Sequence, residues 1–302
     1  MLRSLRLATL VLGVIAAVSG TSAARAVDIY VLTGADIGEF TNISTDFGKI
    51  DTTTGQYSLI KSGVAGSNIV EGLAWNPNSG NFFTTENKSA STTLRTIELN
   101  GNLSSQIGAN VGRSILGMVY RPSDNLLYAY SNEASTQNTG TISPTSGGYS
   151  VLNSNTGWRF WGPEGGRYAM LNDTIYMAAA TDSSAVFGTI GWTATSTFQQ
   201  IRNHRNSFNL AALATDGTTL YAVDTGSGTN GKPAVWSIDP ATGNRLLVTG
   251  IYNLPNGNNT FFYGATFVGS TNAVPEPSTF ALGAIATGAM AAVARRRKAK
   301  KA

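Results

Sequence analysis

Three oxygen-bearing side chains occupy the same position in three copies of a sequence repeat. They are Glu71, Glu164 and Asn209, and each begins a segment that runs through a turn into an aromatic-ended strand. Carboxylate and amide oxygens are the ligands that hard cations such as Ca²⁺, Mg²⁺ or Mn²⁺ prefer. If the repeat aims equivalent side chains at one axis, these residues predict a divalent-cation site. The alternative is that the glutamates sit beside a wet channel and bond backbone amides.

The repeat that must position these residues has a period of about 48 residues. Each copy joins a short apolar strand, a turn rich in Asn, Asp, Gly or Pro, and a second strand that ends in an aromatic residue. Four segments align without gaps: 71–83, 116–128, 164–176 and 209–221. Gly and Asn accept the backbone angles of tight turns, so each segment predicts a β-hairpin.

A second half-repeat completes each unit. Three segments read as a strand and a turn that closes on Thr-Gly: 47–55, 149–157 and 235–243. Weaker copies lie at 94–101 and 186–195. One unit is then four antiparallel strands, which is the size of a propeller blade.

The phase of the repeat predicts how the fold closes. The body of the chain, between the two terminal segments, opens on a second strand of the repeat at 29–32 and ends on a first strand at 262–268. Pairing of these terminal strands would remove two open sheet edges. We therefore expect an all-β protein, a β-propeller of about five four-stranded blades. A β-solenoid is the rival architecture, and six or seven blades would need further units.

Two kinds of propeller share motifs with this chain. Leu116-Gly-Met-Val-Tyr-Arg-Pro and Ile238-Asp-Pro-Ala-Thr-Gly resemble repeat propellers of exported bacterial proteins. Glu71-Gly-Leu-Ala-Trp-Asn-Pro resembles the E-G-P-x-W-D-P motif of the gluconolactonase and senescence-marker propellers, whose glutamate is a metal ligand in a sugar-lactone hydrolase. The resemblance implies a ligand role for Glu71. Leu73 and Asn76 depart from the motif, that family has six blades, and its catalytic aspartate has no clear match here.

Catalytic side chains are otherwise scarce. There is no cysteine and a single histidine, His204, which we expect in a solvated loop; thiol catalysis and multi-histidine metal sites are excluded. No serine lies in a G-x-S-x-G elbow. Trp158 and Trp161 flank an arginine in a Gly-rich stretch, where exposed indoles could stack on a sugar ring. The prediction is a non-enzymatic binding or structural module without a cofactor, except for Ca²⁺ or another divalent cation. The alternative is a metal-dependent hydrolase of the lactonase type.

Both ends of the chain read as targeting signals. The N-terminal stretch has basic residues, an apolar core and an Ala-x-Ala cleavage site. Near the C-terminus, Pro275-Glu276-Pro277 precedes 15 uncharged residues and the basic stop Arg295-Arg296-Arg297-Lys298. The predicted order is a signal peptide at 1–26, a propeller domain at 27–270, a linker at 271–279, a short transmembrane helix at 280–294 and a basic cytoplasmic tail at 295–302. The alternative for the tail is an ordinary membrane anchor.

The C-terminal segment resembles the PEP-CTERM sorting tail of exported bacterial proteins. That resemblance implies cleavage near the Pro-Glu-Pro by an exosortase-type membrane protease. The expected partners are the export machinery, this protease, the membrane during transit, and an exopolysaccharide or a surface protein. The expected route is transient anchoring in the inner membrane, followed by the cell surface or extracellular matrix.

The basic charge of the chain belongs to its ends. Of 21 Lys and Arg, nine lie in the terminal signals, with one of the 17 Asp and Glu. The body therefore holds 12 basic and 16 acidic residues, a net charge of −4. This balance does not favour nucleic acid as a partner.

Overall fold

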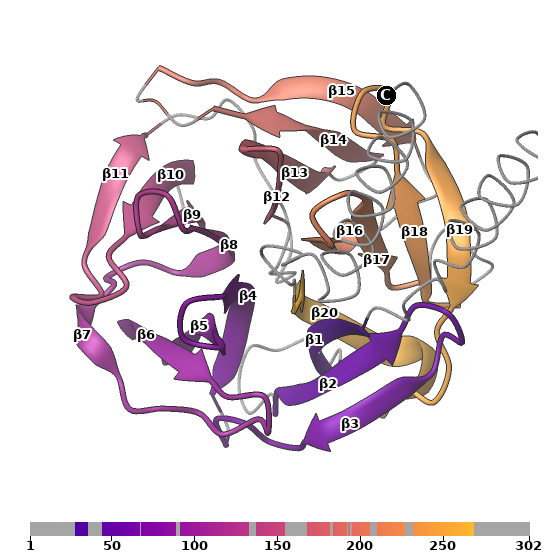
Figure 1. Ribbon diagram of the computed structural model, residues 1–302, viewed down its shortest axis with the longest axis horizontal. Coiled ribbons are helices and arrows are strands. Elements are labelled where there is room, and N and C mark those ends of the chain that lie inside the picture. The colour runs from indigo at the N-terminus through magenta and orange to yellow at the C-terminus, as the bar shows by residue number, and fades with distance from the viewer. Residues whose placement is uncertain are drawn as a thin grey trace, which may run out of the picture. The chain divides into compact units, whose positions relative to one another are not determined.

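Twenty strands form five antiparallel four-stranded sheets, arranged as the blades of a ring (Figure 1). The computed structural model describes residues 28–35, 44–66, 68–88, 91–132, 137–154, 168–181, 184–191, 193, 195–205, 210–226 and 232–268. All of these belong to one compact unit that ends at Val268, and residues 269–302 form a second unit. The predicted all-β propeller of five blades is confirmed. The predicted signal peptide, linker, transmembrane helix and basic tail lie outside the described residues.

Each blade runs from an inner strand at the axis to an outer strand at the rim. Blade 1 contains β20 (Thr260–Phe267), β1 (Asp28–Ala35), β2 (Asp46–Asp51) and β3 (Tyr57–Lys61). Blade 2 contains β4 (Ile69–Asn76), β5 (Asn81–Lys88), β6 (Ser91–Ile97) and β7 (Ile107–Asn110). Blade 3 contains β8 (Ile115–Arg121), β9 (Leu126–Asn132), β10 (Gln137–Ile142) and β11 (Tyr149–Asn153). Blade 4 contains β12 (Tyr168–Leu171), β13 (Thr174–Thr181), β14 (Ser184–Ile190) and β15 (Gln199–Arg205). Blade 5 contains β16 (Leu210–Thr215), β17 (Leu220–Asp224), β18 (Ala234–Ile238) and β19 (Arg245–Gly250).

The ring closes through the two ends of the described chain, as the sequence predicts. Strand β20 pairs antiparallel with β1, from Ile29 opposite Phe267 to Ala35 opposite Thr260. It also lies against the inner strands β4 and β16. A short 3-10 helix, Gly257–Asn259, leads into β20. No helix within the described residues is long and apolar enough to cross a membrane.

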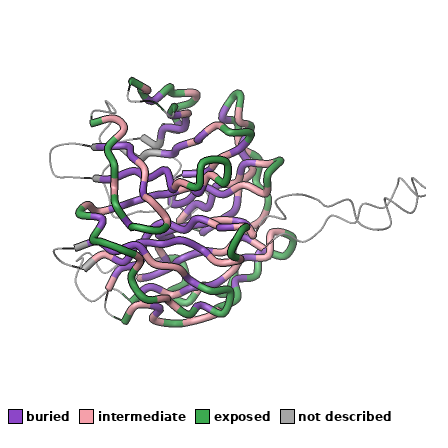
Figure 2. The backbone as a smooth tube through the Cα atoms, turned by 60° about the vertical axis from the view of Figure 1, so that its left-hand side comes forward, coloured by how far each residue is buried: buried purple, intermediate pink, exposed green. Residues whose placement is uncertain are grey.

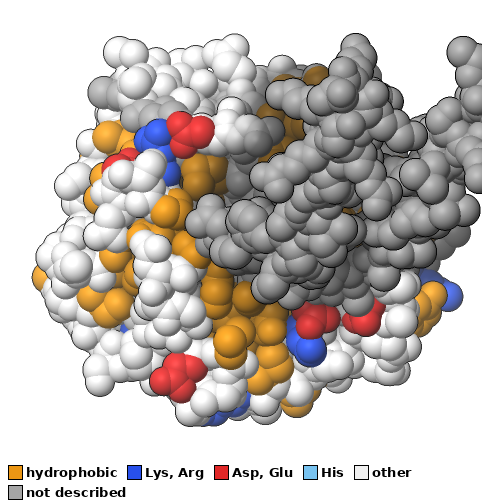
Figure 3. Space-filling model, viewed as in Figure 1, with side chains coloured by type: hydrophobic (Ala, Val, Ile, Leu, Met, Phe, Trp, Pro, Cys, Tyr) orange, Lys and Arg blue, Asp and Glu red, His pale blue; other side chains and the backbone are white. Residues whose placement is uncertain are grey.

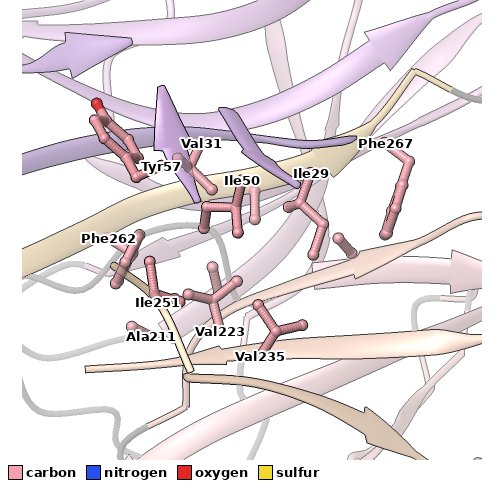
Figure 4. Packing of buried hydrophobic residues seen from close by; sticks show 13 residues of the cluster. Ile29, Val31, Ile50, Tyr57, Ala211, Val223, Val235, Ile251, Phe262 and Phe267 are labelled. Carbon is pink, nitrogen blue, oxygen red and sulfur yellow. The ribbon is translucent and has the colours of Figure 1, made fainter. Parts of the chain in front are cut away.

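The hydrophobic core is divided into five clusters, one at each boundary between blades, which we call a seam. Figure 4 shows the seam between blades 5 and 1, where Ile29 and Phe267 point toward Val223 and Val235. Figure 2 shows the buried stretches running through the interior and the exposed ones on outer strands and turns. Strand residues alternate between the two faces of a sheet, so each blade supplies apolar side chains to both of its seams.

The rim of each seam repeats one contact. The outer strand of a blade, or the residues just after it, meets the turn between the third and fourth strands of the next blade. At the closing seam, the Tyr57 N–H donates to Tyr252 O at 3.0 Å, and the Tyr252 N–H donates to Gly55 O at 2.9 Å. The equivalent bonds elsewhere are Lys61 Nζ to Asn102 Oδ1, Ala109 N to Ser146 O, Asn153 Nδ2 to Ser196 O and Arg202 Nη1 to Asn244 Oδ1. The terminal blades are therefore joined as the internal ones are.

One predicted repeat copy is wrong. Residues 149–157 do not form a third strand and its turn, because β11 (Tyr149–Asn153) is the outer strand of blade 3. The true copy is β10 and the turn that follows it, in which Ser143 takes the place of Asp51 and Asp239. Its hydroxyl accepts the Ser146 N–H, and the Gly147 N–H bonds to its carbonyl. A hydroxyl can make the same local turn bonds as a carboxylate, which hid this copy from an alignment that looked for Asp or Asn before Thr-Gly.

Candidate functional site

The buried polar side chains of the described residues gather at one end of the ring. This is the end at which the inner strands begin, and we call it the entrance end. Apart from Asn76, the buried polar and charged residues lie on strand segments near it, or, for Thr45, directly before one: Thr33, Thr45, Glu71, Thr84, Thr85, Glu86, Thr92, Thr93, Ser131, Asn138, Thr139, His204, Asp224 and Thr260. Apolar side chains dominate the core elsewhere. Buried polar groups need hydrogen-bond partners, so such a concentration marks the entrance end as the candidate site.

A β-bulge near the start of four inner strands builds this layer. The residues paired just before each bulge are Glu71, Ile115, Leu210 and Phe262. Opposite them on the second strands lie four small polar residues, each fully buried: Thr85, Ser131, Asp224 and Thr33. In blade 2, the hydroxyls of Thr84 and Thr85 donate to the carbonyl oxygen of Glu71. A bulge leaves backbone groups without ladder partners, and these hydroxyls satisfy them.

Glu71 begins a chain of hydrogen bonds across blade 2. Its carboxyl group accepts a hydrogen bond from Asn87 Nδ2 in β5. Asn87 Oδ1 accepts one from Thr92 Oγ1 in β6 at 2.7 Å, and the Thr92 N–H donates to Asn110 Oδ1 in β7 at 3.1 Å. All four strands of the blade are thereby linked at the entrance end.

The protonation of Glu71 follows from its burial. The residue is 4% exposed, and burial raises the pKa of its carboxyl group to about 8, an effect that the Asn87 hydrogen bond offsets only in part. At neutral pH the group therefore keeps its proton. A cation that bound here would have to displace that proton, so its affinity would rise with pH.

A second buried carboxylate lies on the opposite face of the same blade. Glu86 Oε2 lies 2.5 Å from Arg95 Nε, and Glu86 Oε1 accepts a hydrogen bond from Asn68 Nδ2 at 2.7 Å. Arg95 also donates to the carbonyl oxygen of Ser104 at 2.6 Å. Sequence reasoning missed this pair, although alternation along the polar strands β5 and β6 was the available signal. Glu86 is held in an ion pair, whereas Glu71 is neutral.

The structure describes only one of the three predicted metal ligands. Glu71 lies at the entrance end as expected, whereas Glu164 and Asn209 lie outside the described residues. The hairpin register supports the alignment of 71–83 with 116–128, because Ala74 opposite Phe83 corresponds to Val119 opposite Tyr128. The segment 209–221 is offset by one residue, because Thr215 opposite Leu220 corresponds to Asn76 opposite Asn81, so Leu210 takes the place of Glu71 in blade 5. Within the described ranges, no group of three or more Asp, Glu or His is positioned to hold a metal. The three-residue site stays a prediction.

Of the other predicted site residues, only His204 lies among the residues that the structure describes. Trp158 and Trp161 lie outside the described residues, as do Pro275, Glu276, Pro277 and the basic stop. His204 was expected in a solvated loop, but it is buried in β15. Burial, together with the charges of Arg245 and Arg202, lowers its pKa to about 4, so the imidazole is neutral at pH 7.

Comparison with known proteins shows the sorting signal. The PEP-CTERM protein-sorting motif matches residues 273–298, so the chain carries this motif at its C-terminus. The motif implies an exported protein with a signal peptide, sorted by an exosortase-type system and anchored transiently in the membrane before display at the surface. No curated protein matches the sequence.

Several solved structures resemble the ring. Nidogen, from a nidogen/laminin complex, is 15% identical with a TM-score of 0.47, over 79% of this chain and 84% of that one. A GH43 glycoside hydrolase is 11% identical with a TM-score of 0.47, over 80% and 59% of the two chains. TolB from Acinetobacter baumannii is 11% identical with a TM-score of 0.42, over 74% and 53%. This chain therefore spans about half the length of TolB.

Proposed function

We propose that the protein is a non-enzymatic binding or structural module of the cell surface or extracellular matrix. Its propeller would hold a glycan, or a surface protein, at the entrance end. The observation that carries this proposal is the concentration of buried polar side chains at that end. Binding needs no nucleophile or acid–base pair, and a layer of hydroxyl and amide groups suits a polar, uncharged ligand such as a sugar.

In this proposal the two targeting signals direct export of the protein and its delivery to the cell surface. The signal peptide is removed after Ala26, and the helix at 280–294 holds the chain in the membrane while the basic stop stays on the cytoplasmic side. An exosortase-type protease then cuts near Pro275-Glu276-Pro277. Proline fixes φ and disfavours helix in the preceding residue, which keeps this linker extended for the protease. The released propeller remains at the surface through its ligand.

Removing the predicted stacking residues should weaken glycan binding. The probe is extracellular polysaccharide extracted from the producing cells, titrated against the mature protein. We expect Trp158→Ala with Trp161→Ala to weaken binding at least about tenfold, because stacked aromatic rings are dominant anchors in such sites. Tyr252→Ala, which removes an aromatic ring that is 54% exposed at the rim, is the matched control and should bind like the parent. Equal binding by the double variant, or no binding by the parent, would contradict the proposal.

Glu71 favours one second candidate, a metal-dependent hydrolase of the lactonase type. A fully buried carboxyl group with a strongly raised pKa is a common feature of functional sites. Hydrolysis of a sugar lactone that requires added Ca²⁺, Mg²⁺ or Mn²⁺, and that is lost in Glu71→Gln, would establish this activity. Absence of any lactone hydrolysis across millimolar concentrations of these metals would leave the binding module.

A further inference from the structure

At the seam between blades 1 and 2, a basic residue of the outer strand packs against the turn of the next blade. Lys61 of β3 packs its methylene groups over Gly101, which has φ of 83°. A Cβ atom added to Gly101 would lie 2.5 Å from the Lys61 Cβ, so only glycine fits there. Lys61 Nζ then donates to Oδ1 of the next residue, Asn102, at 2.8 Å. The residue after that is the apolar Leu103.

The seam between blades 4 and 5 repeats this construction and adds a second cation. Arg202 of β15 packs over Gly243, where an added Cβ would lie 2.7 Å from the Arg202 Cβ, and Arg202 Nη1 donates to Asn244 Oδ1. The next residue is Arg245, in the position of Leu103. Figure 1 shows β15 lying beside β18 and β19 at this seam. Because Arg245 stands where the other seam has Leu103, two arginines lie together at this seam.

The two arginines lie within electrostatic range of each other, and Arg245 is half-buried. The Arg245 guanidinium lies 4.5 Å from the centre of the Trp236 ring, while Arg202 is exposed. Burial lowers the pKa of Arg245; the charge of Asp224 opposes this shift and the charge of Arg202 adds to it. His204 lies within range of both arginines and is neutral. Like charges held together, with one side chain fixed on an indole ring, make a preorganised site for an oxyanion.

We propose that this seam binds the carboxylate groups of an acidic polysaccharide through Arg202 and Arg245. A planar guanidinium group binds a carboxylate through two parallel hydrogen bonds, and the Trp236 ring keeps Arg245 from moving freely. The choice of a glycan polymer rests on the proposed function. A duplex nucleic acid fits less well, because the body carries a net charge of −4 and the described part of the face in Figure 3 shows only scattered charged side chains.

The test uses the mature protein and polygalacturonate oligomers, with neutral dextran of the same length as the control ligand. We expect calorimetric titration to show binding of polygalacturonate that weakens between low and physiological salt, and no binding of dextran at this seam. Arg202→Gln and Arg245→Gln should each lower the affinity about tenfold, the loss expected for one charge-assisted hydrogen bond. Lys61→Gln, at the equivalent place in the other seam, should leave the affinity unchanged.

Two further variants keep the result interpretable. Arg245→Lys keeps the charge but not the planar fork, so it should lose most of the affinity while the melting temperature stays near that of the parent. If the double variant of Arg202 and Arg245 binds polygalacturonate like the parent, or if duplex DNA competes equally well, the proposal is overturned. Loss of polygalacturonate binding in the double variant, with retained binding of the native extracellular polysaccharide, would separate this seam from the proposed glycan site and leave the proposed function standing.

Discussion

A chain that lacks β20 should not fold cooperatively. This strand supplies the inner edge of blade 1, and its residues Phe262, Tyr263 and Phe267 are almost fully buried. Each lost aromatic side chain costs about 3–5 kcal/mol, and the total stability of a domain is only about 5–15 kcal/mol. Its loss also exposes the edge of β1 and the inner faces of β4 and β16. Thermal melting followed by circular dichroism measures the effect.

The matched control for this deletion is a chain that ends at Val268. That truncation removes the second unit of the chain and leaves every described strand in place. It should melt cooperatively, and at the same temperature as the parent protein, because every described strand is still present. Cooperative melting of the chain without β20 at that same temperature would disprove closure of the ring by the terminal strand.

The second large effect concerns pH and Glu71. The pKa of this carboxyl group is about 8 in the folded protein, against an ordinary value of 4.5, so the folded form holds the proton more tightly than the unfolded chain. The stabilisation is complete below pH 4.5 and is lost as pH rises toward 8, at about 1.4 kcal/mol per pH unit. At pH 7 the loss amounts to about 3 kcal/mol. Glu71→Gln keeps an uncharged partner for Asn87, so we expect the variant to lose this slope and to be the more stable protein at pH 7.

Urea unfolding at a series of pH values measures this slope. Glu86 and Arg95 face the opposite side of the sheet, and no charge contributes to the pKa shift of Glu71. Glu86→Gln is therefore the matched control: it should destabilise the protein at pH 7 by leaving Arg95 buried without its carboxylate. Identical pH profiles for Glu71→Gln and the parent would show that Glu71 is ionised in the folded state.

The architecture was predictable because its signals are local. A hairpin is encoded by a few turn residues between two apolar strands, and its repetition fixes the number of blades. Residues 29–32 match the second strand of a repeat and residues 262–268 match the first, so β20 is expected to complete blade 1. The failure at 149–157 has the same origin, since Ser143 replaces an aspartate in a turn that both can stabilise. A pattern that looked for Asp or Asn at this place missed a serine that makes the same turn hydrogen bonds.

The candidate site was less predictable because its residues meet across strands. Glu71 stood out by its motif, but Asn87 and Thr92 reach it only through the register of β4, β5 and β6. In blade 5 the whole hairpin is offset by one residue from the ungapped alignment, since Thr215 opposite Leu220 corresponds to Asn76 opposite Asn81. For this reason the alignment paired Glu71 with Asn209 rather than Leu210. The burial of His204 likewise depends on a neighbouring blade.

The central claim is that this propeller is exported, anchored and then released by cleavage at its sorting motif. The intact mass of the protein recovered from the surface of the producing cells tests that claim most directly. The account predicts a chain that begins near Val27 and ends within 271–279, without the apolar segment and Arg295. A surface protein that keeps residues 280–302 would contradict release and establish a permanent anchor.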